Sequence, residues 1–83
     1  MFTLHQTVIS RSGRDANRFL AVVATDERYV YVCDGKVRPL DNPKRKNPAH
    51  LIPVQTVLGD DAFRSDRALR KALAKQKAEY DKE

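Results

Sequence analysis

An arginine-rich turn between two strand-like stretches constrains the fold of this chain most strongly. The turn occupies residues 11–18, and apolar or β-branched residues lie before it at 7–10 and after it at 19–24. Gly13 permits a positive φ angle, and Asn17 also tolerates a left-handed turn. We therefore expect two short strands joined by a tight connection. This connection carries three arginines, whose planar guanidinium groups suit phosphate: Arg11, Arg14 and Arg18.

The composition favours one small folded domain with an acidic partner. The chain has 83 residues, of which 41% are hydrophobic and 33% charged, which fits a folded domain better than a disordered segment. At this length the core is thin. The formal net charge of +5 favours RNA, DNA or an anionic membrane as the partner.

The cysteine content and the apolar runs bear on the cellular compartment. Cys33 is the single cysteine, so an internal disulfide and a zinc knuckle are excluded. We expect it to be a small apolar strand residue in a reducing cytosol, and Asp34 beside it argues against a reactive thiol. The first residues lack the pattern of a signal peptide, and no apolar run approaches the ~20 residues of a membrane-spanning helix. We therefore expect a cytoplasmic monomer.

Five short stretches of the chain predict strands. They are residues 2–10, 19–24, 29–33, 36–40 and 49–54. The Asp-Gly pair at residues 34 and 35 is typical of a tight type I′ hairpin. Pro39 cannot donate to a ladder, so the fourth strand should be an edge or end there. Residues 41–48 contain two prolines and should form a loop or a stiff extended connection. This pattern predicts a mainly β fold, a small five-stranded SH3-like barrel over residues 1–58.

The C-terminal part of the chain, residues 59–83, predicts a basic helical extension. Ser65 is a suitable cap, and Asp66 suits the positive end of the helix dipole. The helix is expected to run from about residue 66 to about residue 79. Its apolar stripe is narrow and rich in alanine, so we expect weak docking on the barrel or a helix that becomes firm only in a complex. The stripe is formed by Leu69, Ala72, Leu73, Gln76 and Tyr80.

The strand, arginine turn and strand resemble a KOW motif, a unit of SH3-like barrels in ribosomal proteins and transcription elongation factors. The likeness extends over residues 5–55 to small bacterial KOW-domain RNA-binding proteins, which are similar to an archaeal and eukaryotic large-subunit ribosomal protein. Two departures are Asn17, at the most typical glycine of the motif, and residues 5–6, where a glycine usually opens the first strand. The matching blocks are Gly13-Arg14-Asp15, Tyr29-Val30-Tyr31-Val32, Asp34-Gly35-Lys36, Arg38-Pro39-Leu40, Pro43-Lys44-Arg45-Lys46-Asn47 and His50-Leu51.

Three basic segments could converge on one rim of such a barrel, where their cations would meet successive phosphates. They are the arginine turn at residues 11–18, the segment at residues 36–38, and the proline-flanked run at residues 43–48 with His50 after it. Asp15 is expected to be structural, closing the turn or orienting an arginine. Tyr29 and Tyr31 share one face of a strand, and such a pair is more often core than a base-stacking platform. Binding should therefore depend on the backbone and shape of the RNA. The candidate RNA-binding residues are Arg11, Arg14, Arg18, Lys36, Arg38, Lys44, Arg45, Lys46, Asn47 and His50.

No catalytic constellation emerges from the sequence. His5 and His50 have no companion pattern for a metal, and Asp60 and Asp61 before a helix indicate capping. We expect no catalytic residues, no metal, no cofactor, no small-molecule substrate and no membrane partner. The resemblance implies a non-catalytic protein that binds structured ribosomal RNA on or near the ribosome, with ribosomal proteins as further partners. The alternative is a protein–protein module that docks on ribosomal or transcription machinery.

Overall fold

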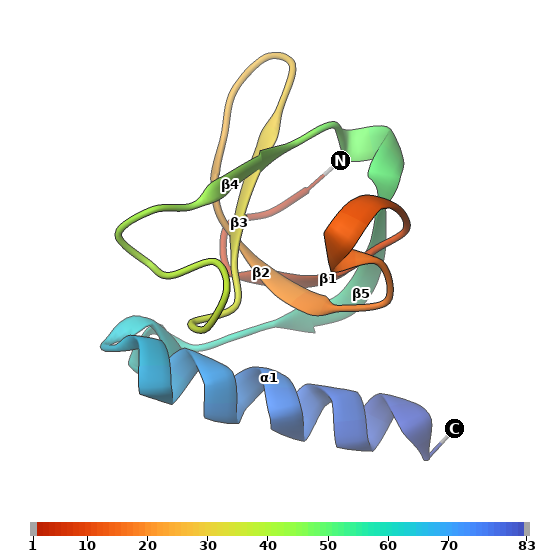
Figure 1. Cartoon of the computed structure of the whole chain (residues 1–83). Helices are drawn as coiled ribbons and strands as arrows, with labels where there is room; N and C mark the ends of the chain where they lie inside the picture. Colours follow the sequence, from red (N-terminus) through yellow and green to blue (C-terminus); the bar gives the residue numbers. More distant parts are fainter. Residues whose placement is uncertain (1, 83) are drawn as a thin grey trace.

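Five strands of the chain form one antiparallel sheet in the computed structural model, which describes residues 2–82 (Figure 1). The strands are β1 (Gln6–Ser10), β2 (Phe19–Thr25), β3 (Val30–Cys33), β4 (Lys44–Lys46) and β5 (Leu51–Val57). Their order in the sheet is β4-β3-β2-β1-β5. The predicted mainly β class with five strands and a C-terminal helix is confirmed. The closure of this sheet into an SH3-like barrel stays a prediction.

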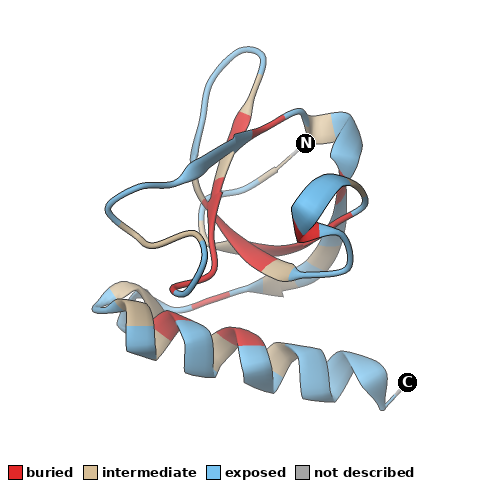
Figure 2. Cartoon of the chain, in the orientation of Figure 1, coloured by how far each residue is buried: buried red, intermediate tan, exposed pale blue. Residues whose placement is uncertain are grey.

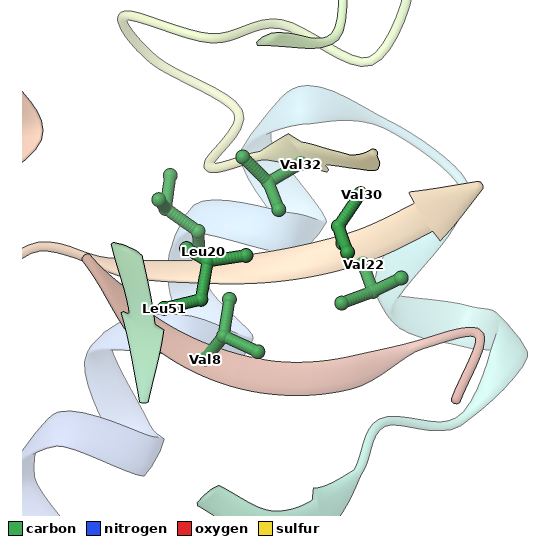
Figure 3. Packing of buried hydrophobic residues seen from close by; sticks show 6 residues of the cluster. All are labelled: Val8, Leu20, Val22, Val30, Val32 and Leu51. Atoms are coloured by element: carbon green, nitrogen blue, oxygen red, sulfur yellow. The ribbon is translucent and has the colours of Figure 1, made fainter. Parts of the chain in front are cut away.

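The sheet curls around a cluster of apolar side chains on its inner face (Figure 3). The strand β2 lies third in the order, and both of its faces are covered, because Leu20 and Val22 join this inner cluster while Ala21 joins a second one. Coverage on both faces explains why residues 19–24 are almost continuously apolar, as predicted for a central strand. The inner cluster contains Val8, Leu20, Val22, Val30, Val32 and Leu51.

The helix α1 (Asp66–Asp81) covers the outer face of the sheet (Figure 2). Its buried residues Leu69 and Leu73 pack with Ala21, Cys33 and Leu58, so the helix and the sheet share this second apolar cluster. The Ser65 hydroxyl accepts a hydrogen bond from the Ala68 N–H at 3.1 Å, which confirms the predicted cap. The helix extends two residues beyond its predicted end at 79. The strength of its docking stays a prediction.

The predicted strand at residues 36–40 is wrong, because this segment belongs to an irregular loop between β3 and β4. The fourth strand lies instead at Lys44–Lys46, inside the stretch predicted to form a loop or a stiff extended connection. The backbone donors of the loop are held by carboxylates. Asp34 Oδ1 accepts the N–H groups of Lys36 and Arg38, each at 2.8 Å, and Asp66 Oδ1 accepts the N–H of Leu40 at 2.8 Å. Because carboxylates occupy these N–H groups, they cannot donate to a neighbouring strand. The chain pairs with β3 only after Pro43.

Short 3-10 helices complete the connections. The arginine turn contains η1 (Gly13–Asp15), and η3 (Asp60–Phe63) leads into α1. Between β4 and β5 lies η2 (Pro48–His50), so the two edge strands of the sheet are joined directly (Figure 1). The last strand therefore begins at Leu51 and continues to Val57, later than the predicted 49–54.

Candidate nucleic-acid interface

The arginine turn is closed by two residues in left-handed geometry. Gly13 has φ +76° and Asn17 has φ +68°, so the left-handed conformation that both residue types tolerate is present at both positions. The Asn17 N–H donates to the carbonyl of Ser10 at 2.8 Å, and the Ser10 N–H donates to the carbonyl of Arg18 at 3.0 Å. These bonds fix the distance between β1 and β2 and hold the arginine side chains at the end of the sheet.

The carboxylate of Asp15 is buried beneath this turn, with a side chain that is only 3% exposed. Its Oδ2 lies 3.3 Å from Nη2 of Arg38 and 3.6 Å from Nζ of Lys46. The Lys46 ammonium also donates to the Ser10 hydroxyl at 2.9 Å and to the Ser12 carbonyl at 3.3 Å. We call Asp15, Arg38, Lys46 and Ser10 the Asp15 cluster. A buried carboxylate needs such partners, because an isolated charge in a low-dielectric interior is very costly.

The Asp15 cluster connects all three basic segments of the sequence. Asp15 comes from the turn, Arg38 from the loop after β3, and Lys46 from the proline-flanked run. A backbone hydrogen bond also joins the turn to the segment that follows β4, since the Arg11 N–H donates to the His50 carbonyl at 2.8 Å. The expected structural role of Asp15, orienting an arginine, matches its contact with Arg38. Two candidate RNA-binding residues, Arg38 and Lys46, therefore have their charged groups turned inward onto Asp15.

A second acid, Asp34, shapes the loop that follows β3. Its side chain is 10% exposed, and its Oδ2 lies 3.5 Å from Nη1 of Arg18, whose own side chain remains 43% exposed. The Asp34 carboxylate also accepts hydrogen bonds from backbone N–H groups of the loop, which turn the chain back on itself. Lys36 is exposed at this turn. Sequence reasoning missed this organising role. The signal that could have indicated it is an aspartate directly before glycine, because an aspartate side chain accepts N–H groups two residues ahead.

The proline-flanked run does not present its three cations together. Alternation along β4 places Lys44 and Lys46 on one face and Arg45 on the other. Lys46 is buried in the Asp15 cluster, whereas Lys44 is exposed. The Arg45 guanidinium carbon lies 4.6 Å from the centre of the Tyr29 ring, in cation–π geometry. The run thus contributes two exposed cations, Lys44 and Arg45, on opposite faces of β4, beside the buried one.

The tyrosine pair lies outside both apolar clusters, so the expectation that it is core is wrong. Tyr29 and Tyr31 are each partly exposed. The Tyr31 hydroxyl donates to Asp26 Oδ2 at 2.6 Å. This hydrogen bond is the main cause that lowers the pKa of Asp26 and raises the pKa of Tyr31. Tyr31 is thereby fixed on the outer surface by a neighbouring acid.

The remaining candidates, Asn47 and His50, lie at η2 and are exposed. The Asn47 side chain accepts the Ala49 N–H at 2.9 Å, so it caps this short helix. His50 contributes its backbone carbonyl to the turn through Arg11.

Apart from Arg45, which packs on Tyr29, five exposed cations lie on the three segments that the Asp15 cluster joins. Their side chains reach solvent, and within residues 2–82 only Arg18 among them forms an ion pair. We call this set the rim. It consists of Arg11, Arg14, Arg18, Lys36 and Lys44.

The other titratable groups have environments that suit structure. Cys33 is fully buried, and its thiol donates to the Pro39 carbonyl at 3.4 Å. Burial, with the negative charges of Asp66, Asp34 and Asp41, raises the pKa of this thiol to about 11. Its placement as an apolar strand residue is confirmed. No group of three or more metal-ligating side chains occurs in the described part of the chain, and no helix there is long and apolar enough to cross a membrane.

Comparison with known proteins gives no relative: no family model matches the chain, and none of the curated proteins matches it.

Proposed function

We propose that this protein is a non-catalytic, cytoplasmic RNA-binding protein, whose rim holds the backbone of structured ribosomal RNA on or near the ribosome. The observation that carries the proposal is the Asp15 cluster. It joins three basic segments, far apart in the sequence, and the five rim cations are exposed on these same segments. Exposed cations on converging loops are the footprint of phosphate recognition.

The internal pairing of the cluster supports this use of the surface. Two cations neutralise Asp15, so the carboxylate does not repel a phosphate bound above the turn. Arg14 and Arg18 supply guanidinium forks that can bind phosphate oxygens in pairs. Lys36 and Lys44 offer point charges on the flanking segments, suited to the next phosphates along an RNA backbone. Recognition of this kind reads backbone position and helix shape.

The tyrosines add little to base recognition in this proposal. One face of the Tyr29 ring is covered by Arg45, and the Tyr31 hydroxyl is bound to Asp26. Arg45 therefore occupies one of the ring faces on which successive bases could stack, as they do in proteins that bind single strands.

A salt titration of binding to a structured ribosomal RNA fragment tests the proposal. If five rim cations meet phosphates, the logarithm of the association constant should fall linearly with the logarithm of salt concentration, with a slope of about −4. A slope near zero, or no binding at low salt, would contradict phosphate recognition by the rim.

The second candidate is a protein–protein module, favoured by the edge strand β5. Its residues Ile52 and Val57 are large, apolar and 41% and 59% exposed. An edge strand with exposed apolar side chains is suited to pair with a strand of another protein. Under this alternative, Val57→Lys should abolish binding to a ribosomal or transcription protein. Under RNA binding through the rim, the same substitution should leave RNA affinity unchanged.

A further inference from the structure

A groove lies between the arginine turn and α1, and its lining extends beyond the rim to residues of the helix. It has a volume of about 310 Å³, at the lower end of the range of small-ligand pockets. Its floor is apolar and comes from two elements, Phe19 at the start of β2 and Leu73 with Ala74 on α1. The groove exists because the helix crosses the outer face of the sheet beside the turn (Figure 1).

The floor is held in place by neighbouring contacts. The Phe19 ring is partly exposed and packs against Tyr80 of α1 in a T-shaped arrangement, with ring centres 5.4 Å apart and planes 74° apart. Leu73 is buried in the apolar cluster between helix and sheet. The floor therefore presents the apolar surface of a fixed aromatic ring beside a short alanine side chain, to which a flat ring can lie close.

The walls of the groove are positively charged. Two cations come from the rim, Arg18 and Lys36, and two from α1, Arg70 and Lys77. The single acid of the lining, Asp34, is 10% exposed and already bound by Arg18.

The two helix cations differ in how firmly they are held. Arg70 Nη1 donates to the carbonyl of Gly35 at 2.8 Å, which fixes its guanidinium at one end of the groove. Lys77 Nζ pairs with Asp81 at 3.0 Å and lies over the Phe19 ring, 5.9 Å from its centre, so this flexible side chain must move aside before a base can stack there. Both partners of that pair are more than half exposed, so it is weak and the ammonium can exchange Asp81 for a phosphate.

We propose that this groove binds one unpaired nucleotide of the RNA, with its base against Phe19 and Ala74 and its phosphates between the helix cations and the rim. The inference rests on the proposed function and adds a preference for RNA with an extruded base. An apolar floor between cationic walls complements a nucleotide, which combines a flat base with anionic phosphates. In this arrangement α1 becomes part of the binding surface.

The test compares two RNAs, a hairpin with a perfectly paired stem and the same hairpin with one bulged nucleotide in the stem. The wild-type protein should bind the bulged RNA about tenfold more tightly, as expected for one base stacked on an aromatic side chain. Lys77→Glu, at the groove, should abolish this preference. Lys75→Glu makes the same change of charge on α1 at a residue outside the groove lining and should preserve it. Ala74→Glu, which places a carboxylate on the floor, should also remove the preference while binding to the paired hairpin persists.

The outcomes separate the groove from the rim. Equal affinity of the wild-type protein for both hairpins would overturn the groove inference and leave RNA binding by the rim intact. A preference that survives Lys77→Glu and Ala74→Glu, or that Lys75→Glu also removes, would overturn it as well. Failure to bind either hairpin would overturn both the groove inference and the proposed function. Far-UV circular dichroism of each variant verifies that α1 remains folded.

Discussion

The Asp15 cluster and the rim contain the same types of positive side chain, drawn from the same three segments, but they place them in opposite environments. In the cluster, Arg38 and Lys46 are 24% and 9% exposed and bind a buried carboxylate. In the rim, Arg14 and Lys44 are exposed and free of ion pairs within the described residues 2–82. The cluster therefore supports the fold, and the rim is the surface that we propose for RNA binding.

This difference shows that a basic run is not one functional unit. Lys44 and Lys46 lie two residues apart on the same face of β4, yet one is exposed and the other is buried. The position of each ammonium relative to Asp15 decides its role, and the charge count along the sequence does not. The comparison predicts that cluster substitutions cost stability, whereas rim substitutions cost RNA affinity.

The largest expected effect is on the cluster itself. Asp15→Ala leaves Arg38 and Lys46 without their shared carboxylate, and breaking a buried ion pair in this way costs about 3–5 kcal/mol. Urea denaturation followed by circular dichroism measures the loss in free energy of unfolding. A cost below about 1 kcal/mol, typical of a surface position, would remove the distinction between cluster and rim.

The two lysines of β4 provide a matched pair of substitutions. Lys46→Ala should lower the free energy of unfolding by about 2–3 kcal/mol, because Asp15 retains only Arg38 as a partner. Lys44→Ala should change it by no more than about 0.5 kcal/mol. The same denaturation experiment measures both. Equal losses of unfolding free energy in the two variants would show that the buried and the exposed lysine do not differ in their contribution to stability.

Substitution of Gly35 tests how tightly the loop between β3 and β4 packs against the start of α1. Its φ is +78°, and a Cβ added there would overlap the backbone carbonyl of Asp66 at the start of α1. Gly35→Ala should therefore cost about 2 kcal/mol, from backbone strain and displacement of the helix. Gly59→Ala is the control, since a Cβ at Gly59 has no neighbour within 4 Å. Thermal unfolding of the two variants should differ clearly, and coincident curves would contradict the tight contact with α1.

The smallest expected effect is on the loop at residues 34–40. The rate at which a reagent labels the Cys33 thiol measures how often this loop opens. The thiol is buried under Pro39 with a pKa raised to about 11, so it should resist a thiol reagent in the folded protein at neutral pH. Lys46→Ala should accelerate labelling, whereas Lys44→Ala should not. Because the folded-state pKa lies above the ordinary value of 9.0, the unfolded chain ionises first. Stability should be unaffected below pH 9 and fall as the pH rises toward 11, and Cys33→Ala should remove that part of the decline.

Features set by neighbouring residues could be predicted from the sequence. Continuous apolar character identified β2 as a central strand, and Ser65 identified the start of α1. Asn17 could be assigned a left-handed conformation, because asparagine tolerates it better than other residues with a side chain.

Features set by distant partners could not be predicted. The segment at residues 36–40 is extended by propensity, but Asp66, 26 residues from Leu40, takes one of its backbone donors. The burial of Lys46 depends on Asp15, which only the folded sheet brings within reach. The expectation that the tyrosine pair is core fails because Val30 and Val32 take the inner face of β3, so the alternating tyrosines lie outside both apolar clusters.

The most direct test of the account is the salt dependence of RNA binding by two charge-matched variants. Arg11→Glu with Arg14→Glu removes two rim cations, and Arg67→Glu with Lys71→Glu makes the same change of charge on α1, outside the rim and the groove. The rim variant should retain its unfolding free energy, lose affinity for structured RNA and reduce the log–log salt slope by about 2, while the helix variant keeps the wild-type slope. Equal losses in both variants, or none in the rim variant, would contradict the claim that the converged turn holds the RNA.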